Sequence, residues 1–268
     1  MKLVYQDLLK FLNEKPSKEV LSDKLFQLGH EHEIHGDIFD MELTPNRGDC
    51  HSLIGLARDL NVFFGMSDAV EIYKENIENL DINFENLATD DCPKISFLEI
   101  EIEEASIDYR PYLENYFTAL GNNKTNFFTD ISNYISYENG QPTHCYDADK
   151  INGKLVFQEL DTDQEFKTLF GKKINLTSKN SVFLLNDKVI NLAGVVGGIE
   201  TSCSLDTKTV LLECAFFKPE AIMGKSVKYD IQSEASHKFE RFVDPECQDR
   251  TIRRFIKIVD EHTNIKDM

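Results

Sequence analysis

The stretch Ser96-Phe97-Leu98-Glu99-Ile100-Glu101-Ile102-Glu103 decides the fold. Its apolar side chains alternate with glutamates, which is the two-residue period of a half-buried strand. Shorter strand-like runs follow at 153–158, 182–185, 188–193 and 208–213. The dipeptide Asn186-Asp187 is a turn between two of them. Short strands mixed with a few helices predict an α+β fold.

The chain before this strand is expected to be helical. Apolar residues recur at helical spacing over residues 4–12, 20–28 and 50–64. Ser17 can cap the second helix and Asp49 the third, while Gly29 and Gly65 can end them. We therefore expect a small helical N-terminal domain over residues 1–65.

Residues 66–92 are interpreted as an acidic connector. They contain only Lys74 as a basic residue against eight carboxylates. These are Asp68, Glu71, Glu75, Glu78, Asp81, Glu85, Asp90 and Asp91. This balance is typical of a solvated linker, so a domain boundary is expected near residue 93 and a second domain over 93–268. Within that domain a helix is expected from Pro111 to Gly121.

Composition excludes several classes of protein. The chain has 29 basic and 47 acidic residues, a net charge of −18, so bulk nucleic-acid binding, DNA included, is not expected. No apolar run is long enough for a membrane span or a secretory signal. Six cysteines without a CxxC indicate reduced thiols and a cytoplasmic location. No metal site is expected, because neither these cysteines nor the stretch with His30, His32 and His35 has ligand spacing.

Three segments carry candidate chemistry. Around His144, in the run 140–147, a glycine and a proline fix the backbone. This histidine either holds a water or a carbonyl, or is a satisfied side chain in a rigid turn. Gly197 and Gly198 permit a ligand to approach backbone N–H groups, although ordinary turns use glycines too. Glu213 is a carboxylate in an apolar run, whose partner is either a protein donor or a ligand hydroxyl.

Together with Met41-Glu42-Leu43-Thr44-Pro45-Asn46-Arg47-Gly48-Asp49-Cys50 and Ala235-Ser236-His237-Lys238-Phe239-Glu240-Arg241, these segments resemble the family of bacterial phenylalanyl-tRNA synthetase β subunits. The five segments stand in the family's order and span most of the chain. The resemblance implies that residues 1–65 are the N-terminal domain of that subunit. It also implies that residues 94 to about 250 are the editing module, which hydrolyses tyrosine wrongly esterified to phenylalanine tRNA.

Two parts of the usual subunit are missing from this sequence. The family inserts an oligonucleotide-binding barrel in its N-terminal domain, but the run from Gly29 to Met41 has no room for it. The sequence also ends at Met268, before the family's catalytic-core-like and anticodon-binding domains. The chain is therefore expected to be either an excised piece or a natural stand-alone module.

The resemblance implies a role for each candidate residue. We expect His144 to orient or deprotonate a water, and the backbone N–H groups around Gly197 and Gly198 to stabilise the developing oxyanion or fix the ester carbonyl. Glu213 accepts the phenol O–H of tyrosine, and phenylalanine would leave that buried carboxylate unpaired at a cost of about 1–3 kcal/mol or more. Further residues implied to line the same site are Ser132, Asn133, Ser233 and Ala235.

Several positions depart from the family's pattern. Thr-Asp-Ala is usual where Ser233-Glu234-Ala235 stands, and threonine where Ser132 stands. Arginine is usual at Lys238 and glycine at Phe242. These departures keep a second function open, a non-catalytic structural or subunit-interaction domain of the synthetase.

The resemblance also implies partners. The acidic surface gives little hold on a tRNA body, so the chain is expected to take only the 3′ end of phenylalanine tRNA into its site. The α subunit and the missing β domains would supply docking. No cofactor is implied for this chain, because the full synthetase is expected to use ATP and magnesium elsewhere.

Overall fold

Residues Lys94–Ile102 form strand β5 in the computed structural model of this chain. The predicted alternation is confirmed, because Leu98, Ile100 and Ile102 are buried while Glu99 is exposed. The neighbouring strands are β6 (His144–Asp147), β13 (Thr209–Phe216) and β14 (Ile265–Asp267). All four form one antiparallel sheet of order β14-β5-β13-β6.

A second sheet has five strands, and the predicted short runs supply most of them. Its strands are β4 (Phe84–Asn86), β7 (Leu155–Glu159), β10 (Ser181–Leu185), β11 (Lys188–Leu192) and β12 (Val196–Gly197). The order is β12-β11-β10-β7-β4, with only β4 and β7 parallel. Asn186 and Asp187 both have positive φ and form the expected turn between β10 and β11.

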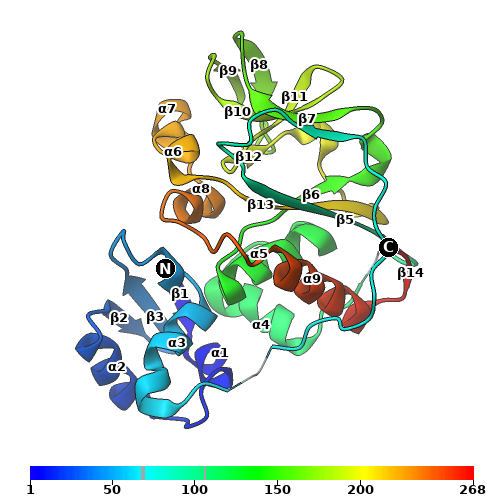
Figure 1. Ribbon diagram of the computed structural model, residues 1–268. Helices are drawn as coiled ribbons and strands as arrows, with labels where there is room; N and C mark the ends of the chain where they lie inside the picture. The colour runs from blue at the N-terminus through cyan, green and yellow to red at the C-terminus, as the bar shows by residue number, and fades with distance from the viewer. Residues whose placement is uncertain (68–69, 106) are drawn as a thin grey trace.

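The four-stranded sheet lies between a layer of helices and the second sheet (Figure 1). The helices are α4 (Pro111–Leu120), α5 (Phe127–Asn139) and α9 (Gln248–His262). Neighbouring residues of β13 face opposite layers. Leu212 packs in the helical core with Phe255, whereas Leu211 packs in the core between the sheets with Phe183. The α+β class predicted from the sequence is confirmed.

Short elements complete the domain. A two-stranded sheet is formed by β8 (Gln164–Lys167) and β9 (Lys173–Leu176). The short helices between β13 and α9 are α6 (Pro219–Ile222), α7 (Lys225–Tyr229) and α8 (Glu234–Phe239). Figure 1 shows the β8–β9 hairpin at the end of the molecule farthest from the N-terminal residues.

The N-terminal part is not purely helical, which corrects the expectation for residues 1–65. Its helices are α1 (Tyr5–Lys10), α2 (Lys18–Gln27) and α3 (Leu53–Phe64). Its strands are β1 (Lys2–Val4), β2 (Glu31–His35) and β3 (Ile38–Glu42), in the order β1-β3-β2. Only Phe39 and Met41 of the β2–β3 hairpin are buried. Because most of its other residues are charged or polar, the sequence does not show the alternation of apolar and polar residues that predicts a strand. Residues 36–37 alone join the two strands.

Helix ends follow the predicted signals at most positions. Ser17 caps α2 by accepting from Val20 N–H, and Gly65 ends α3 at φ 67°. The α4 helix begins at Pro111 and stops before Gly121 at φ 68°, as expected. The α3 cap is different: Ser52 accepts from Gly55 N–H at 3.0 Å. Asp49, the expected cap, instead lies in a 3₁₀ turn and pairs with Arg47.

The acidic connector packs against both layers. The Glu71 carbonyl accepts from the Arg254 guanidinium at 3.0 Å, and Tyr73 N–H donates to the Arg253 carbonyl. β4 lies inside the connector and pairs with β7, so the second sheet begins before the expected boundary at residue 93. Exposed acidic residues dominate this segment and mask the short edge strand. Asp68, one of the eight carboxylates, lies outside the described residues.

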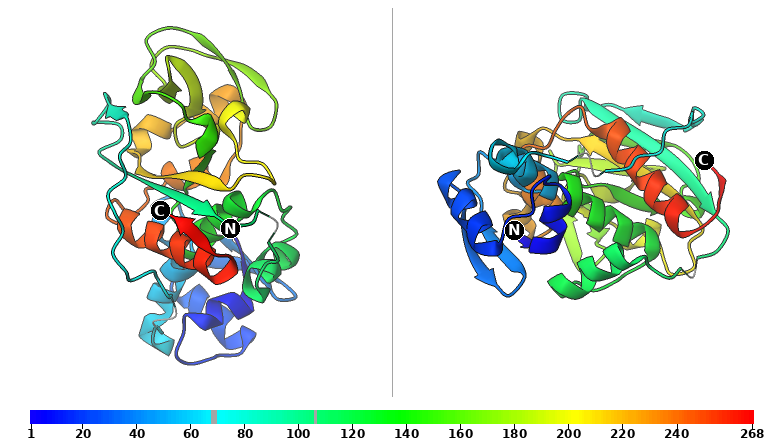
Figure 2. Two further views of the ribbon diagram at one scale, coloured as in Figure 1. Left: turned by 90° about the vertical axis from the view of Figure 1, so that its right-hand side faces the viewer. Right: turned by 90° about the horizontal axis from the view of Figure 1, so that it is seen from below.

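Figure 2 shows the N-terminal lobe, the helices and the sheets stacked as three tiers. The structure describes residues 1–67, 70–105 and 107–268. Within these ranges no helix is long and apolar enough to cross a membrane.

Candidate functional site

The centre of the candidate site lies between the two sheets. β6 and β13 pair with His144 directly opposite Glu213, so both side chains leave the same face of the sheet. Tyr146, two residues along β6, shares that face, and its ring meets the His144 ring edge-on at 4.4 Å. Asn191 reaches the same place from β11. The site is thus built from two strands of one sheet and one strand of the other.

Glu213 is held by two protein donors. Tyr146 Oη donates to Glu213 Oε2 at 2.7 Å, and Asn191 Nδ2 lies 2.8 Å from Tyr146 Oη and 3.4 Å from the same carboxyl oxygen. Burial raises the pKa of Glu213 to about 8, although these hydrogen bonds lower it. The carboxyl is therefore mostly neutral at pH 7, whereas the sequence suggested a buried charge.

His144 is a neutral imidazole for the same reason. Burial lowers its pKa to about 4. Its Nε2 atom is buried without a hydrogen-bond partner in the described structure, and so is the nearby hydroxyl of Thr168. Buried polar atoms are normally bonded, so these two atoms are available to bond a ligand group. His51 Nε2, Thr201 Oγ1 and Gln248 Nε2 are also buried without a partner in the described structure.

Gly197 and Gly198 have different surroundings. A Cβ on Gly197 would overlap the His144 ring and come within 2.6 Å of Nε2, so only glycine fits there. Gly198 N–H donates to the Ile190 carbonyl at 2.8 Å and is committed to the sheet. Along an antiparallel pair of strands, residue pairs that exchange backbone hydrogen bonds alternate with pairs that do not. Gly197 and Asn191 form a pair of the second kind, so the N–H of Gly197 points away from β11. The N–H of Gly197 is thus not used in the β11–β12 ladder, whereas that of Gly198 is.

Ser132 supports His144 from α5. Its hydroxyl donates to the carbonyl of Thr143 at 2.9 Å and lies 2.7 Å from the Thr143 hydroxyl. Gln141, which is buried, fixes the same loop by donating to the Pro142 and Ala215 carbonyls at 2.8 Å. The residue before the candidate base is thus tied to a helix, and the loop to β13.

The remaining predicted residues lie farther out. Ser233 donates to the Val195 carbonyl at 2.7 Å, two residues before Gly197, and caps α8. Ala235 is half-buried against the core between the sheets. Asn133 is exposed on α5 and lines a cavity of about 540 Å³ with Glu234. The structure therefore brings His144, Gly197 and Glu213 together, but Asn133 opens to a different space.

A family model described as the B3/4 domain matches residues 106–264, more than half of the chain. The chain belongs to the B3/4 domain family.

Curated relatives extend the match beyond the B3/4 domain. The phenylalanine–tRNA ligase β subunit of Ehrlichia ruminantium (strain Welgevonden) is 32% identical over 90% of this chain and 31% of its own length. That of Bordetella pertussis (strain Tohama I) is 34% identical over 79% and 27%. That of Francisella tularensis (strain SCHU S4) is 28% identical over 85% and 29%. The resemblance to the synthetase β subunits is confirmed, and the chain spans less than a third of these relatives.

Among solved structures, an N-terminal fragment of the phenylalanyl-tRNA synthetase β subunit from Pyrococcus horikoshii matches. Its TM-score is 0.42 and its sequence identity 14%, over 80% of this chain and 67% of that one.

Three residues of the candidate site were not predicted. Tyr146 and Asn191 surround Glu213, and Thr168 lies beside Gly198. Asn191 is a single polar residue in the apolar run of β11. Glu213 was predicted from the same kind of signal, a polar residue within an apolar strand. Tyr146 shares the period-two face of His144, but only the β6–β13 register shows what it contacts.

Outside the B3/4 domain, one group of side chains has the composition of a metal centre. His30, Cys50 and Asp59 bring ligand atoms within 4.8 Å of one another. Arg47 already fills this group, because its Nη2 lies 2.7 Å from Asp59 Oδ2 and 2.8 Å from Cys50 Sγ. Burial raises the pKa of the Cys50 thiol far above its usual value, so it stays protonated and is a poor ligand. The group is a structural ion-pair network.

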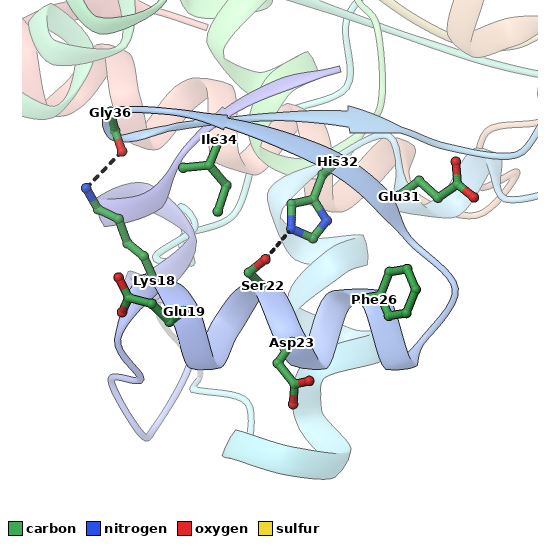
Figure 3. Close-up of a pocket in the computed structure, with 9 residues that line it drawn as sticks. All are labelled: Lys18, Glu19, Ser22, Asp23, Phe26, Glu31, His32, Ile34 and Gly36. Carbon is green, nitrogen blue, oxygen red and sulfur yellow. Dashed lines mark hydrogen bonds between the residues drawn. The ribbon is translucent and has the colours of Figure 1, made fainter.

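The largest of the described cavities also lies outside the B3/4 domain. It measures about 900 Å³ and lies between α2 and the β2–β3 hairpin (Figure 3). Phe26 and Ile34 line it together with the carboxylates of Glu19, Asp23 and Glu31. None of the predicted site residues lines this cavity.

Proposed function

We propose that this chain is an aminoacyl-tRNA editing hydrolase, which removes tyrosine wrongly esterified to phenylalanine tRNA. The observation that carries the proposal is the convergence of His144, Gly197 and Glu213 at one buried place with unpartnered polar atoms. The names of the curated relatives support the choice of phenylalanine tRNA.

His144 and Gly197 are assigned the chemistry. Ester hydrolysis needs a positioned water more than a covalent nucleophile. A neutral imidazole can accept a proton from that water, and the orphaned Nε2 of His144 is the atom available for it. The Gly197 N–H is assigned to the developing oxyanion. Ser132 acts through Thr143 to hold the imidazole in place.

Glu213 is assigned the recognition of tyrosine. Its Oε2 is bonded to Tyr146 and Asn191, which leaves Oε1 for the phenol of the substrate. Because the pKa of Glu213 is raised to about 8, the neutral carboxyl has an O–H that can donate to the phenol oxygen. Phenylalanine has no such oxygen and would leave the O–H unpaired, at about 1–3 kcal/mol.

The partners in this proposal are the 3′ end of phenylalanine tRNA and the synthetase α subunit. The net charge of −18 opposes a tRNA body, so docking is assigned to the α subunit and to further β-subunit domains.

The test is deacylation of tyrosyl- and phenylalanyl-tRNA at low salt, with and without the α subunit. His144→Ala is expected to lower kcat for both esters. Glu213→Ala is expected to lower the preference for tyrosyl over phenylalanyl ester more than it lowers total hydrolysis. Glu99→Ala, an exposed glutamate of β5, is the matched control. No hydrolysis by the wild-type chain with the α subunit would exclude the proposal, and equal losses on both esters would remove the recognition role of Glu213.

A non-catalytic interaction domain is the second candidate. The observation in its favour is that Tyr146 already satisfies one oxygen of Glu213, and His144 packs directly on Gly197. In that case the chain would bind the α subunit and leave both esters intact.

A further inference from the structure

The β8–β9 hairpin, residues 164–176, presents an aromatic side chain on a rigid tip. Gly171 N–H donates to the Thr168 carbonyl and Thr168 N–H to the Lys172 carbonyl, both at 2.9 Å. Gly171 has φ 76°, so the tip is a tight turn closed by a left-handed glycine. Phe170 sits in this turn with 72% of its surface exposed.

The hairpin that carries Phe170 is rich in lysine. Residues 164–176 contain Lys167, Lys172 and Lys173 against Glu165 alone, a net charge of +2 in a chain of −18. The Lys172 ammonium is paired with Asp230 at 2.9 Å, which leaves Lys167 and Lys173 on the hairpin face. Lys167 and Lys173 stand directly opposite each other on the exposed face of the hairpin. Like charges in that position are destabilising. Glu165 pairs with Lys173 at 3.2 Å, but no described carboxylate lies within 4.0 Å of the Lys167 ammonium.

The tip is attached to the candidate site. Leu169 N–H donates to the Gly197 carbonyl at 2.9 Å, and Thr168 forms a β-bridge with Gly198. Phe170 directly follows Leu169, whose N–H bonds to the Gly197 carbonyl. Gly197 in turn packs against the His144 ring. The tip therefore lies directly beside the strand that carries Gly197.

We propose that the β8–β9 hairpin binds the unpaired nucleotides that precede the 3′ end of the substrate tRNA. Phe170 stacks on a base, and Lys167 and Lys173 hold phosphates on either side of it. Aromatic stacking accepts any base, and the paired lysines lose their repulsion when an anion lies between them. This inference rests on the proposed function, since it takes the nucleic acid from that proposal.

Local charge distinguishes Phe170 from Phe26, the phenylalanine with the most similar exposure. Phe26 on α2 is 70% exposed, nearly the same as Phe170. It lines the cavity of Figure 3, where Glu19, Asp23 and Glu31 would repel a phosphate. Phe26→Ala is therefore a matched control for Phe170→Ala.

The experiment measures binding of a fluorescein-labelled, single-stranded RNA ending in CCA to the full chain by anisotropy at low salt. Phe170→Ala is expected to weaken binding about 5- to 150-fold, while Phe170→Trp and Phe26→Ala bind like the wild type. The double variant Lys167→Gln/Lys173→Gln is expected to make the slope of log K against log salt shallower by about 0.7 for each phosphate that the lysines no longer bind.

Failure of this inference and failure of the proposed function are distinguishable. Equal RNA binding by Phe170→Ala and Phe26→Ala, or no RNA binding by the wild type, overturns the role of the hairpin even if the ester is hydrolysed. RNA binding that depends on Phe170 without hydrolysis supports the hairpin and removes the editing function. A Phe170→Ala variant that loses binding to the α subunit, but not to RNA, makes the hairpin a protein-binding element and overturns the inference.

Discussion

At the scale of single residues, Glu213 combines two opposing effects. Burial disfavours its charged form, whereas Tyr146 and Asn191 donate hydrogen bonds that favour it. Burial is the larger effect, and the pKa rises from the ordinary 4.5 to about 8. A neutral carboxyl can both donate and accept, so it can recognise a hydroxyl without a buried charge.

This pKa predicts how stability depends on pH. The native state keeps the Glu213 proton up to about pH 8, while the unfolded chain releases it near 4.5. Stability contributed by this group is complete below pH 4.5 and falls as pH rises to 8, by about 3 kcal/mol between 4.5 and 7. Glu213→Gln keeps the hydrogen-bond geometry but has no proton to release. The free energy of unfolding of this variant should therefore increase relative to that of the wild type as the pH rises from 4.5 to 8.

Urea unfolding at several pH values measures this difference. Burial of His144 acts in the opposite sense, because its pKa is lowered to about 4 and its contribution rises with pH up to the ordinary 6.5. The comparison must therefore be between variants. Glu99→Gln should run parallel to the wild type. A Glu213→Gln curve that also runs parallel would show that Glu213 ionises normally.

The sequence shows which residues are unusual but not what they contact. Glu213 and His144 were predicted because a polar residue in an apolar or rigid run needs a reason. Tyr146 and Asn191 escaped prediction, because their roles depend on a strand register and on the meeting of two sheets. Gly198 was assigned an oxyanion role, yet its N–H belongs to the sheet ladder.

At the scale of elements, β12 depends on the absence of a side chain at Gly197. Gly197→Ala would drive a methyl group into the His144 ring. Overpacking of this kind costs about 1–3 kcal/mol. In a His144→Ala background the same methyl group meets open space, so the cost should largely disappear. A double-mutant cycle from urea unfolding measures this coupling. Additive free energies would mean that the strand and the ring move independently.

Some elements with a strong local signal were predicted, but the long helices α5 and α9 were missed although their signals are equally strong. The helices at 18–27, 53–64 and 111–120 have caps, an initial proline or glycine ends, and the strand at 94–102 has a clear two-residue alternation. The sheet of the N-terminal lobe was missed, because β1 has three residues and pairs with β3, far along the chain. Its pairing depends on long-range contacts that periodicity does not report.

At the scale of the whole molecule, the N-terminal lobe and the B3/4 domain share one apolar core. Leu8 and Phe39 of the lobe pack in the same cluster as Ile135 of α5. Tyr137 on α5 also accepts a hydrogen bond from Val4 N–H at 2.9 Å. The two parts should therefore unfold together in one transition.

Phe242 and Gly48 meet where the lobe touches the segment after α8. Phe242 has φ 75°, a conformation that favours glycine. Gly48 packs closely against that backbone. A Cβ added at Gly48 would overlap the carbonyl oxygen of Arg241 and lie 2.5 Å from the carbonyl oxygen of Phe242. Backbone atoms cannot turn aside as a side chain can.

Gly48→Ala should therefore separate the lobe from the B3/4 domain. Its backbone conformation suits alanine, so the cost is the clash, at least about 1–3 kcal/mol. We expect thermal and urea unfolding to broaden or split into two transitions, with the N-terminal lobe melting first. Gly121→Ala is the control, because its Cβ would meet no atom within 4 Å and its φ of 68° adds only a local penalty of about 1 kcal/mol. A single sharp transition for Gly48→Ala, equal to that of Gly121→Ala, would mean that the lobes are held together elsewhere.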